Sequence, residues 1–129
     1  MTYILYNPLA NNGNGESAVC ALPFSEGARL VDIRRIGDLV AYLKSKSPSD
    51  TVIVTGGDGT LHHLVNALGG FCPANPLYYA PTGAANDFVR DLPEEEKKDG
   101  LILLNPYISH LPKVHFRLIS TFAQKLFLL

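Results

Sequence analysis

The sequence predicts an α/β fold, a three-layer α/β/α domain built on a mainly parallel sheet. Short runs of β-branched and aromatic residues alternate along the chain with segments of helical spacing, and strands joined by crossover helices favour parallel pairing. The runs are apolar almost throughout, as in "TVIVT", which is typical of strands covered on both faces. A chain of 129 residues, 47% of them hydrophobic, is long enough to form one such domain with its own core.

The alternation predicts four strands and two helices before residue 82. The strands are expected at Thr2–Tyr6, Ala28–Arg34, Thr51–Thr55 and Pro76–Ala80. The helices are expected at Asp38–Ser45 and Leu61–Leu68. In the second helix, apolar residues repeat at positions i, i+3, i+4 and i+7, which predicts one buried face.

The C-terminal part predicts fewer elements, and the pattern weakens after Gly100. The segment "LPEEEKKDG" (92–100) is charged on every side, which predicts the exposed start of a helix. A strand is expected at Lys113–Ile119. The apolar ending "KLFLL" indicates that a following segment, a partner or docking onto the domain covers it. We therefore expect a domain truncated after about residue 110, with this tail as a candidate surface for a homo-oligomer.

Composition and charge exclude several classes of protein. The formal net charge of −1 provides no general attraction for nucleic acid, so any phosphate binding must be local. Cys20 and Cys72 stand far apart in unrelated contexts and predict neither a metal knuckle nor a redox pair. The N-terminus has no basic and apolar leader, and no apolar run reaches the roughly 18 residues needed to cross a bilayer. The chain is therefore expected to be cytoplasmic.

The loop "GGDGT" (Gly56–Thr60) follows the apolar run "TVIVT". A D-G pair is typical of a hairpin turn, but the residues after Thr60 have helical spacing rather than alternation. The loop is therefore expected to join a strand to the N-terminus of a helix, where free backbone amides and the helix dipole attract phosphate. Gly56, Gly57 and Gly59 would permit positive φ and close approach of a ligand, and Thr60 could cap the helix or offer its hydroxyl.

The carboxylate of Asp58 would repel a bare phosphate in that loop. It could hold a cation that bridges to phosphates, accept a proton from an attacking hydroxyl, or cap backbone amides. The first two alternatives imply phosphoryl transfer.

Two more loops of small and polar residues follow predicted strands. "PTGAAND" (81–87) follows "LYYA", and Asn86 or Asp87 would serve as a helix N-cap. "NPLANNGNGES" (7–17) follows "TYILY", and its Gly13 and Gly15 nominally match a dinucleotide fingerprint. Those glycines come too late after the strand for that turn, so a flexible polar loop over a phosphate is expected instead.

With these three loops in order, the chain resembles the diacylglycerol kinase catalytic domain family, which includes bacterial lipid kinases and sphingosine kinases and is distantly similar to NAD kinases. The resemblance runs from about Tyr3 to Leu92. It implies the N-terminal nucleotide-binding half of a two-domain fold, with ATP and Mg²⁺ in the crevice and most of the second, β-sandwich domain absent. It also implies that ATP transfers its γ-phosphate to a lipid hydroxyl such as that of diacylglycerol, at the inner face of a membrane.

The resemblance implies a catalytic role for Asp58 near the metal and phosphates. The residues that it implies at the nucleotide are Asn7, Pro8, Leu9, Ala10, Asn11, Gly56, Gly57, Asp58, Gly59, Thr60, Leu61, His62, Gly83, Ala84 and Asn86. No metal ligand is assigned.

Three departures from the family pattern leave the activity open. Ala84 stands where the family usually has threonine, and His62 and His63 stand where it has asparagine and glutamate. Adjacent residues of a helix point about 100° apart, so the two histidines cannot form a same-face metal pair. The third departure is the missing second domain. The alternatives are a lipid kinase, a nucleotide-binding module without catalysis, and an NAD-dependent oxidoreductase, which would leave "GGDGT" unexplained.

Overall fold

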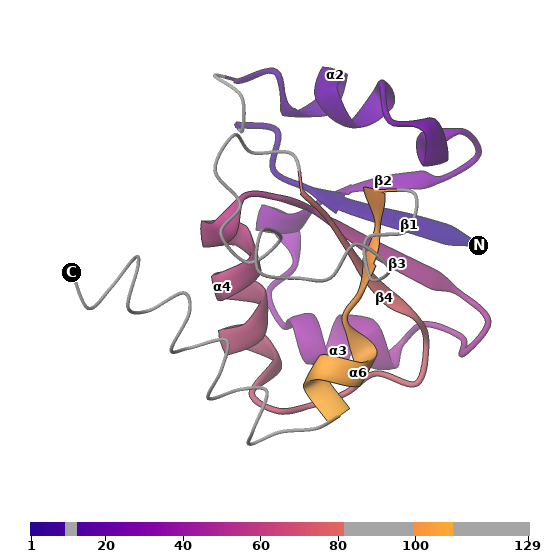
Figure 1. Cartoon of the computed structure of the whole chain (residues 1–129), viewed down its shortest axis with the longest axis vertical. Coiled ribbons are helices and arrows are strands. Elements are labelled where there is room, and N and C mark those ends of the chain that lie inside the picture. The colour runs from indigo at the N-terminus through magenta and orange to yellow at the C-terminus, as the bar shows by residue number, and fades with distance from the viewer. Residues whose placement is uncertain (10–12, 82–99, 110–129) are drawn as a thin grey trace.

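The structure, a computed structural model, describes residues 1–9, 13–81 and 100–109. Its centre is a five-stranded sheet in the order β2-β1-β3-β4-β5 (Figure 1). The strands are β1 (Thr2–Tyr6), β2 (Arg29–Asp32), β3 (Thr51–Gly56), β4 (Leu77–Pro81) and β5 (Ile102–Leu103). The first four run parallel and β5 is antiparallel to β4. The expected α/β fold with a mainly parallel sheet is confirmed.

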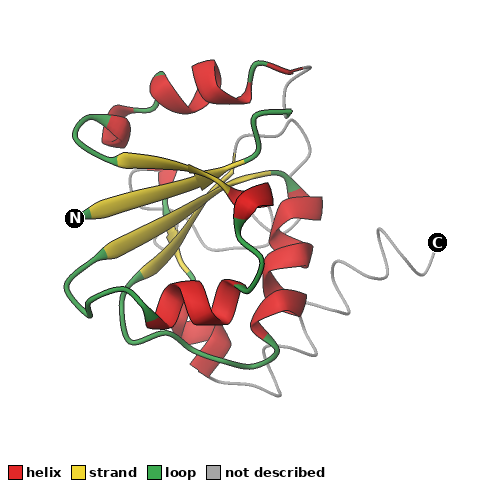
Figure 2. Cartoon of the chain, turned by 180° about the vertical axis from the view of Figure 1, so that it is seen from behind, coloured by secondary structure: helices red, strands yellow, loops and turns green. Residues whose placement is uncertain are grey.

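Helices lie on both faces of this sheet, which gives three layers (Figure 2). They are α2 (Gly15–Cys20), α3 (Leu39–Lys44), α4 (Asp58–Leu68) and α6 (Asn105–Ser109), with 3-10 turns at η1 (Pro23–Ser25) and η2 (Ile33–Arg35). Apolar residues of α3, α4 and α6 form one core with one face of the sheet. On the other face Val19 of α2 is buried with Ile4, Ile53 and Ala80.

The alternation of side chains along the strands explains the two cores. In β3, Val52 and Val54 face α3 and α4, whereas Ile53 between them faces α2, and all three are at most 2% exposed. A strand that is buried on both faces has apolar residues at successive positions, as in the run "TVIVT" of β3.

The predicted elements differ from the observed ones mainly at their ends. β2 stops at Asp32, whose carboxylate accepts a hydrogen bond from the Arg34 amide at 3.0 Å and caps η2, so the strand is shorter than the expected 28–34. α4 begins at Asp58, three residues before the expected start. α2, β5 and α6 were not predicted. The expected helix start at 92–100 falls almost wholly outside the described residues, and the expected strand at 113–119 lies wholly outside them.

Asn105 fastens α6 to the sheet. Its side-chain oxygen accepts a hydrogen bond from the buried Leu77 amide at 2.7 Å, and its side-chain nitrogen donates to the carbonyls of Asn75 (3.0 Å) and Pro73 (3.3 Å). One side chain thereby satisfies three backbone groups at the start of β4.

Within the part of the chain that the structure describes, none of the helices has the length and apolar character needed to cross a membrane.

Candidate functional site

The order of the strands marks one place at which a ligand would bind. β2 lies on one side of β1 and β3 lies on the other, and the connections α2 and α3 cover opposite faces of the sheet. In open α/β sheets, ligands bind beyond the carboxyl ends of the strands, at the point where the connections diverge in this way. Here that point is the gap between the ends of β1 and β3, where the chain continues as Asn7-Pro8 and as Gly57-Asp58.

The glycine turn joins a strand directly to a helix, as the sequence predicts. β3 ends at Gly56, Gly57 is the N-cap, and the first intrahelical hydrogen bond of α4 runs from the Leu61 amide to the Gly57 carbonyl at 3.2 Å. The hairpin alternative is wrong because β3 and β4 are parallel. No described side chain caps the turn, so the first amides of α4 and the positive end of its dipole face the carboxyl ends of the strands.

Only one glycine of this turn adopts a positive φ. Gly56 has φ +150°, and a Cβ added to it would collide with the side chain of Thr60. Gly57 has φ −96°, and Gly59 lies inside α4, so neither residue uses the positive φ that glycine permits. Thr60 is in the first turn of α4 rather than at its N-cap, so the N-cap alternative is wrong, and the contact through its hydroxyl stays a prediction. Its side chain packs against Gly56 instead.

The end of β3 is supported from both neighbouring strands. The Tyr79 hydroxyl, on β4, donates a hydrogen bond to the Gly56 carbonyl at 2.9 Å. The Thr55 hydroxyl donates to the Leu5 carbonyl of β1 at 3.3 Å. Sequence reasoning missed both contacts, because a tyrosine or threonine within an apolar strand has no signal that separates it from other core residues.

The loop after β1 is held by short-range contacts. The Asn7 side-chain oxygen accepts a hydrogen bond from the Leu9 amide at 2.9 Å, and the Gly15 amide donates to the Pro8 carbonyl at 3.2 Å. Gly15 is buried, and a Cβ there would collide with the Asn7 carbonyl oxygen. This glycine therefore permits α2 to pack against the loop. It starts a helix instead of lying in a flexible loop, and it does not form a dinucleotide turn at the strand end.

Ionisable groups gather beside this site at the ends of β1 and β2. Tyr6 is the register partner of Asp32. Burial raises the pKa of Tyr6, and the negative charges of Glu16 and Asp32 add to that effect. The side-chain hydrogen bonds from Arg34, at 3.0 and 2.7 Å, lower the pKa of Asp32. The hydrogen bonds from Arg34 thus keep the Asp32 carboxylate ionised.

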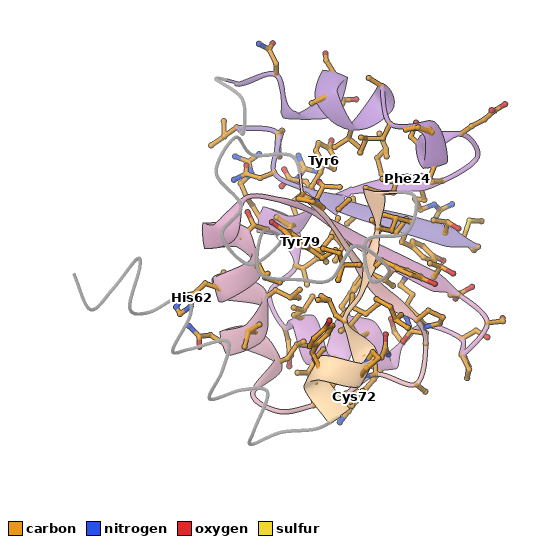
Figure 3. All side chains as sticks on the ribbon, in the orientation of Figure 1. Tyr6, Phe24, His62, Cys72 and Tyr79 are labelled. Atoms are coloured by element: carbon orange, nitrogen blue, oxygen red, sulfur yellow. The ribbon has the colours of Figure 1, made fainter. Side chains whose placement is uncertain are left out.

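The two histidines of α4 differ in their surroundings. His62 is partly buried on the outer side of the helix, and its Nε2 lies 2.8 Å from the Asn66 side-chain nitrogen (Figure 3). His63 is exposed. Among the described residues, no group of His, Cys, Asp and Glu side chains is placed to hold a metal ion.

Several predicted site residues cannot be placed in this geometry. Of the predicted residues, the structure brings Asn7, Pro8, Gly56, Gly57 and Thr60 to the carboxyl ends of adjacent strands. Leu61 is fully buried in the core, so its side chain is not at the surface of the site. The residues outside the described part are Ala10, Asn11, Gly83, Ala84, Asn86 and Asp87, together with the side chain of Asp58.

Comparison with known proteins gives the family. A model of the diacylglycerol kinase catalytic domain matches residues 1–110. The chain belongs to the diacylglycerol kinase catalytic domain family. Two proteins from two strains of Staphylococcus epidermidis, named "Putative lipid kinase SERP0390" and "Putative lipid kinase", are each 33% identical to it over 88 residues. No solved structure matches the chain.

The match to these two relatives covers 64% of this chain but only 29% of the length of each relative. The chain is therefore a lipid kinase-like domain that corresponds to less than a third of those proteins. The expected truncation after about residue 110 stays a prediction.

Proposed function

We propose that this domain binds the polyphosphate of ATP at the Gly56–Thr60 turn and is the nucleotide-binding part of a lipid kinase. The proposal depends above all on one observation. In a chain of the diacylglycerol kinase catalytic family, the N-terminus of α4, which no described side chain caps, directly follows β3 at the point where the strand connections diverge. Backbone amides and a helix dipole in this position favour a phosphate.

The described residues leave both glycines of the turn accessible. A Cβ added to Gly57 or Gly59 would meet no described atom within 4 Å, which supports the approach of a phosphate to this turn. Mg²⁺, bound with ATP, would neutralise phosphate charge during transfer. We propose that Asp58 acts beside the metal and phosphates, either as a ligand of the cation or as the group that takes the proton of the attacking hydroxyl.

The proposed substrate is a lipid hydroxyl such as that of diacylglycerol, which would bring the protein to the inner face of a membrane. Family membership and the names of the two relatives support this class of reaction. A second candidate is a nucleotide-binding module without catalysis, which Ala84 favours because the family usually has threonine there. In either case the apolar tail is a candidate surface for a homo-oligomer.

Nucleotide binding is tested by isothermal titration of the full chain with ATP, with and without Mg²⁺. Gly57→Val tests the turn without straining the backbone. Gly57 has φ −96° and ψ −165°, which suit a β-branched residue, and the new Cβ would meet no described atom within 4 Å. The branched side chain would still block the approach of a phosphate to the amides. We expect Gly57→Val and Asp58→Asn to weaken Mg-ATP binding at least tenfold, and the exposed His63→Gln to leave it unchanged.

If Gly57→Val and Asp58→Asn bind ATP as tightly as His63→Gln and the unsubstituted protein do, the turn is not the phosphate site. Tighter binding of NADH than of ATP would favour an oxidoreductase. Phosphorylation of diacylglycerol in mixed micelles by the purified chain separates the kinase from the module without catalysis. Binding of Mg-ATP with no product would support the module.

A further inference from the structure

Tyr79 connects the buried core to the glycine turn. It lies in β4, opposite Val54 of β3, and its side chain is fully buried among residues of α4 and the sheet (Figure 3). A buried phenol requires a hydrogen-bond partner to offset the loss of water. One partner here is the carbonyl of Gly56, the last residue of β3 and the first of the turn, at 2.9 Å.

This hydrogen bond sets the direction of an amide as well as that of a carbonyl. The peptide unit between Gly56 and Gly57 is planar, and in a trans peptide the C=O and N–H bonds point in opposite directions. The carbonyl points toward the Tyr79 hydroxyl, so the Gly57 amide points away from it. Along β3 the amides alternate between the two neighbouring strands, since Thr51 donates to Met1 and Val52 donates to Pro76. Continuing this alternation puts the Gly57 amide on the β1 side, where the candidate site lies.

The hydrogen bond matters more at this position than in an ordinary strand. Glycines have the fewest steric limits on φ and ψ, and two of them stand in succession here, so local sterics restrict this peptide unit little. Thr60 packs against Gly56 but leaves Gly57 unobstructed. An external partner is therefore needed to hold the peptide unit in one orientation.

We propose that Tyr79 is the positioning residue of the glycine turn: its hydroxyl holds the Gly56 carbonyl so that the Gly57 amide is aimed at the phosphates of the nucleotide. The part of this inference that concerns phosphates depends on the proposed function. The orientation of the turn does not depend on it, so the two can fail separately.

Tyr42 offers a matched control. Its hydroxyl is also buried, yet no described residue hydrogen-bonds it, and it lies on α3, outside the turn. Tyr42→Phe and Tyr79→Phe each remove one buried hydroxyl and preserve the ring. A difference between the two variants therefore reports contacts of the Tyr79 hydroxyl, that with Gly56 among them, rather than the loss of a phenol from the core, and the position of the NOE change identifies the turn.

The first measurement is made on the ¹⁵N-labelled full chain without nucleotide. Backbone ¹H–¹⁵N NOEs report fast motion of each amide. We expect Tyr79→Phe to lower the NOE values of residues 57–59 while the strands remain as in the unsubstituted protein, and Tyr42→Phe to leave both unchanged. Unaltered NOEs at 57–59, or a loss spread evenly over the whole core, would overturn the proposal.

The second measurement is the affinity for Mg-ATP. A single net hydrogen bond corresponds to roughly a fivefold change, so we expect Tyr79→Phe to bind about five times more weakly and Tyr42→Phe to bind as the unsubstituted protein does. If the unsubstituted protein binds and Tyr79→Phe binds equally well, Tyr79 does not position the phosphate contacts. If the unsubstituted protein does not bind ATP, the proposed function fails, and the NOE measurement still decides whether Tyr79 orients the turn.

Discussion

Replacing either of two glycines three residues apart, Gly56 and Gly59, by alanine should change stability in opposite directions. Gly56 has φ +150°, and an added Cβ would collide with the side chain of Thr60. Gly59 lies in the first turn of α4, and a Cβ there would meet nothing within 4 Å among the described residues. The same chemical change is therefore strained at the first position and unobstructed at the second.

The magnitudes follow from these two environments. An unfavourable backbone conformation costs about 1–3 kcal/mol and overpacking about 1–3 kcal/mol, so Gly56→Ala should lower the free energy of unfolding by about 2–6 kcal/mol. Domains of this kind are stable by only about 5–15 kcal/mol, which makes this a severe loss. Gly59→Ala should raise the free energy of unfolding by about 0.5–1 kcal/mol, because glycine in a helix carries an entropic penalty relative to alanine.

Urea unfolding followed by circular dichroism measures both variants, with equal m-values as the check that the unfolded states are alike. The Gly56→Ala, Thr60→Gly double variant should recover part of the loss, because Thr60→Gly removes the atoms with which the new Cβ collides. A Gly56→Ala protein as stable as its parent would refute the reasoning. So would a Gly59→Ala protein destabilised to the same extent.

Three further variants probe other parts of the structure. Asn105→Ala should lower the free energy of unfolding by about 2–4 kcal/mol in urea, because the buried Leu77 amide loses its acceptor; little change would mean that water replaces the side chain. Gly15→Ala should cost about 1–3 kcal/mol by overpacking against the loop after β1, and an unchanged urea midpoint would contradict that contact. The folded-state pKa of Asp32 is lowered by Arg34, so its contribution to stability is present above about pH 4, the unfolded value, and is lost as the pH falls through the folded value. In Asp32→Asn the free energy of unfolding should therefore fall less steeply as the pH is lowered below about 4. The same fall with pH in the variant and its parent would show that the Asp32–Arg34 pair contributes nothing to stability.

Much of the sheet was predictable because burial on both faces leaves a strong mark on a strand. The apolar runs in β1, β3 and β4 are bounded by turn residues, and their ends were predicted to within a residue. The place of the glycine turn between β3 and α4 was predictable for the same reason. A strand that ends in Gly56-Gly57 before a segment of helical spacing leaves few other ways to place the turn.

Short elements escaped prediction. α2 has six residues, and only Gly15 and Val19 are buried, so its sequence shows no helical period. β5 has two residues within an apolar stretch that could equally be a strand or part of a helix. Both elements gain their stability from contacts with distant parts of the chain, such as the packing of Val19 on Ile4 and Ile53.

The amino-acid sequence by itself determined the four parallel strands, the helices α3 and α4, and the position of the glycine turn at the end of a buried strand, because side-chain period and glycine content are local properties. Only the tertiary structure decided which glycine requires its special conformation and which distant side chain orients the turn. Gly56 is restricted by Thr60, and its carbonyl is held by Tyr79, 23 residues further along the chain. A hydrogen bond between two strands depends on their register, and register is a property of the folded sheet rather than of either segment alone.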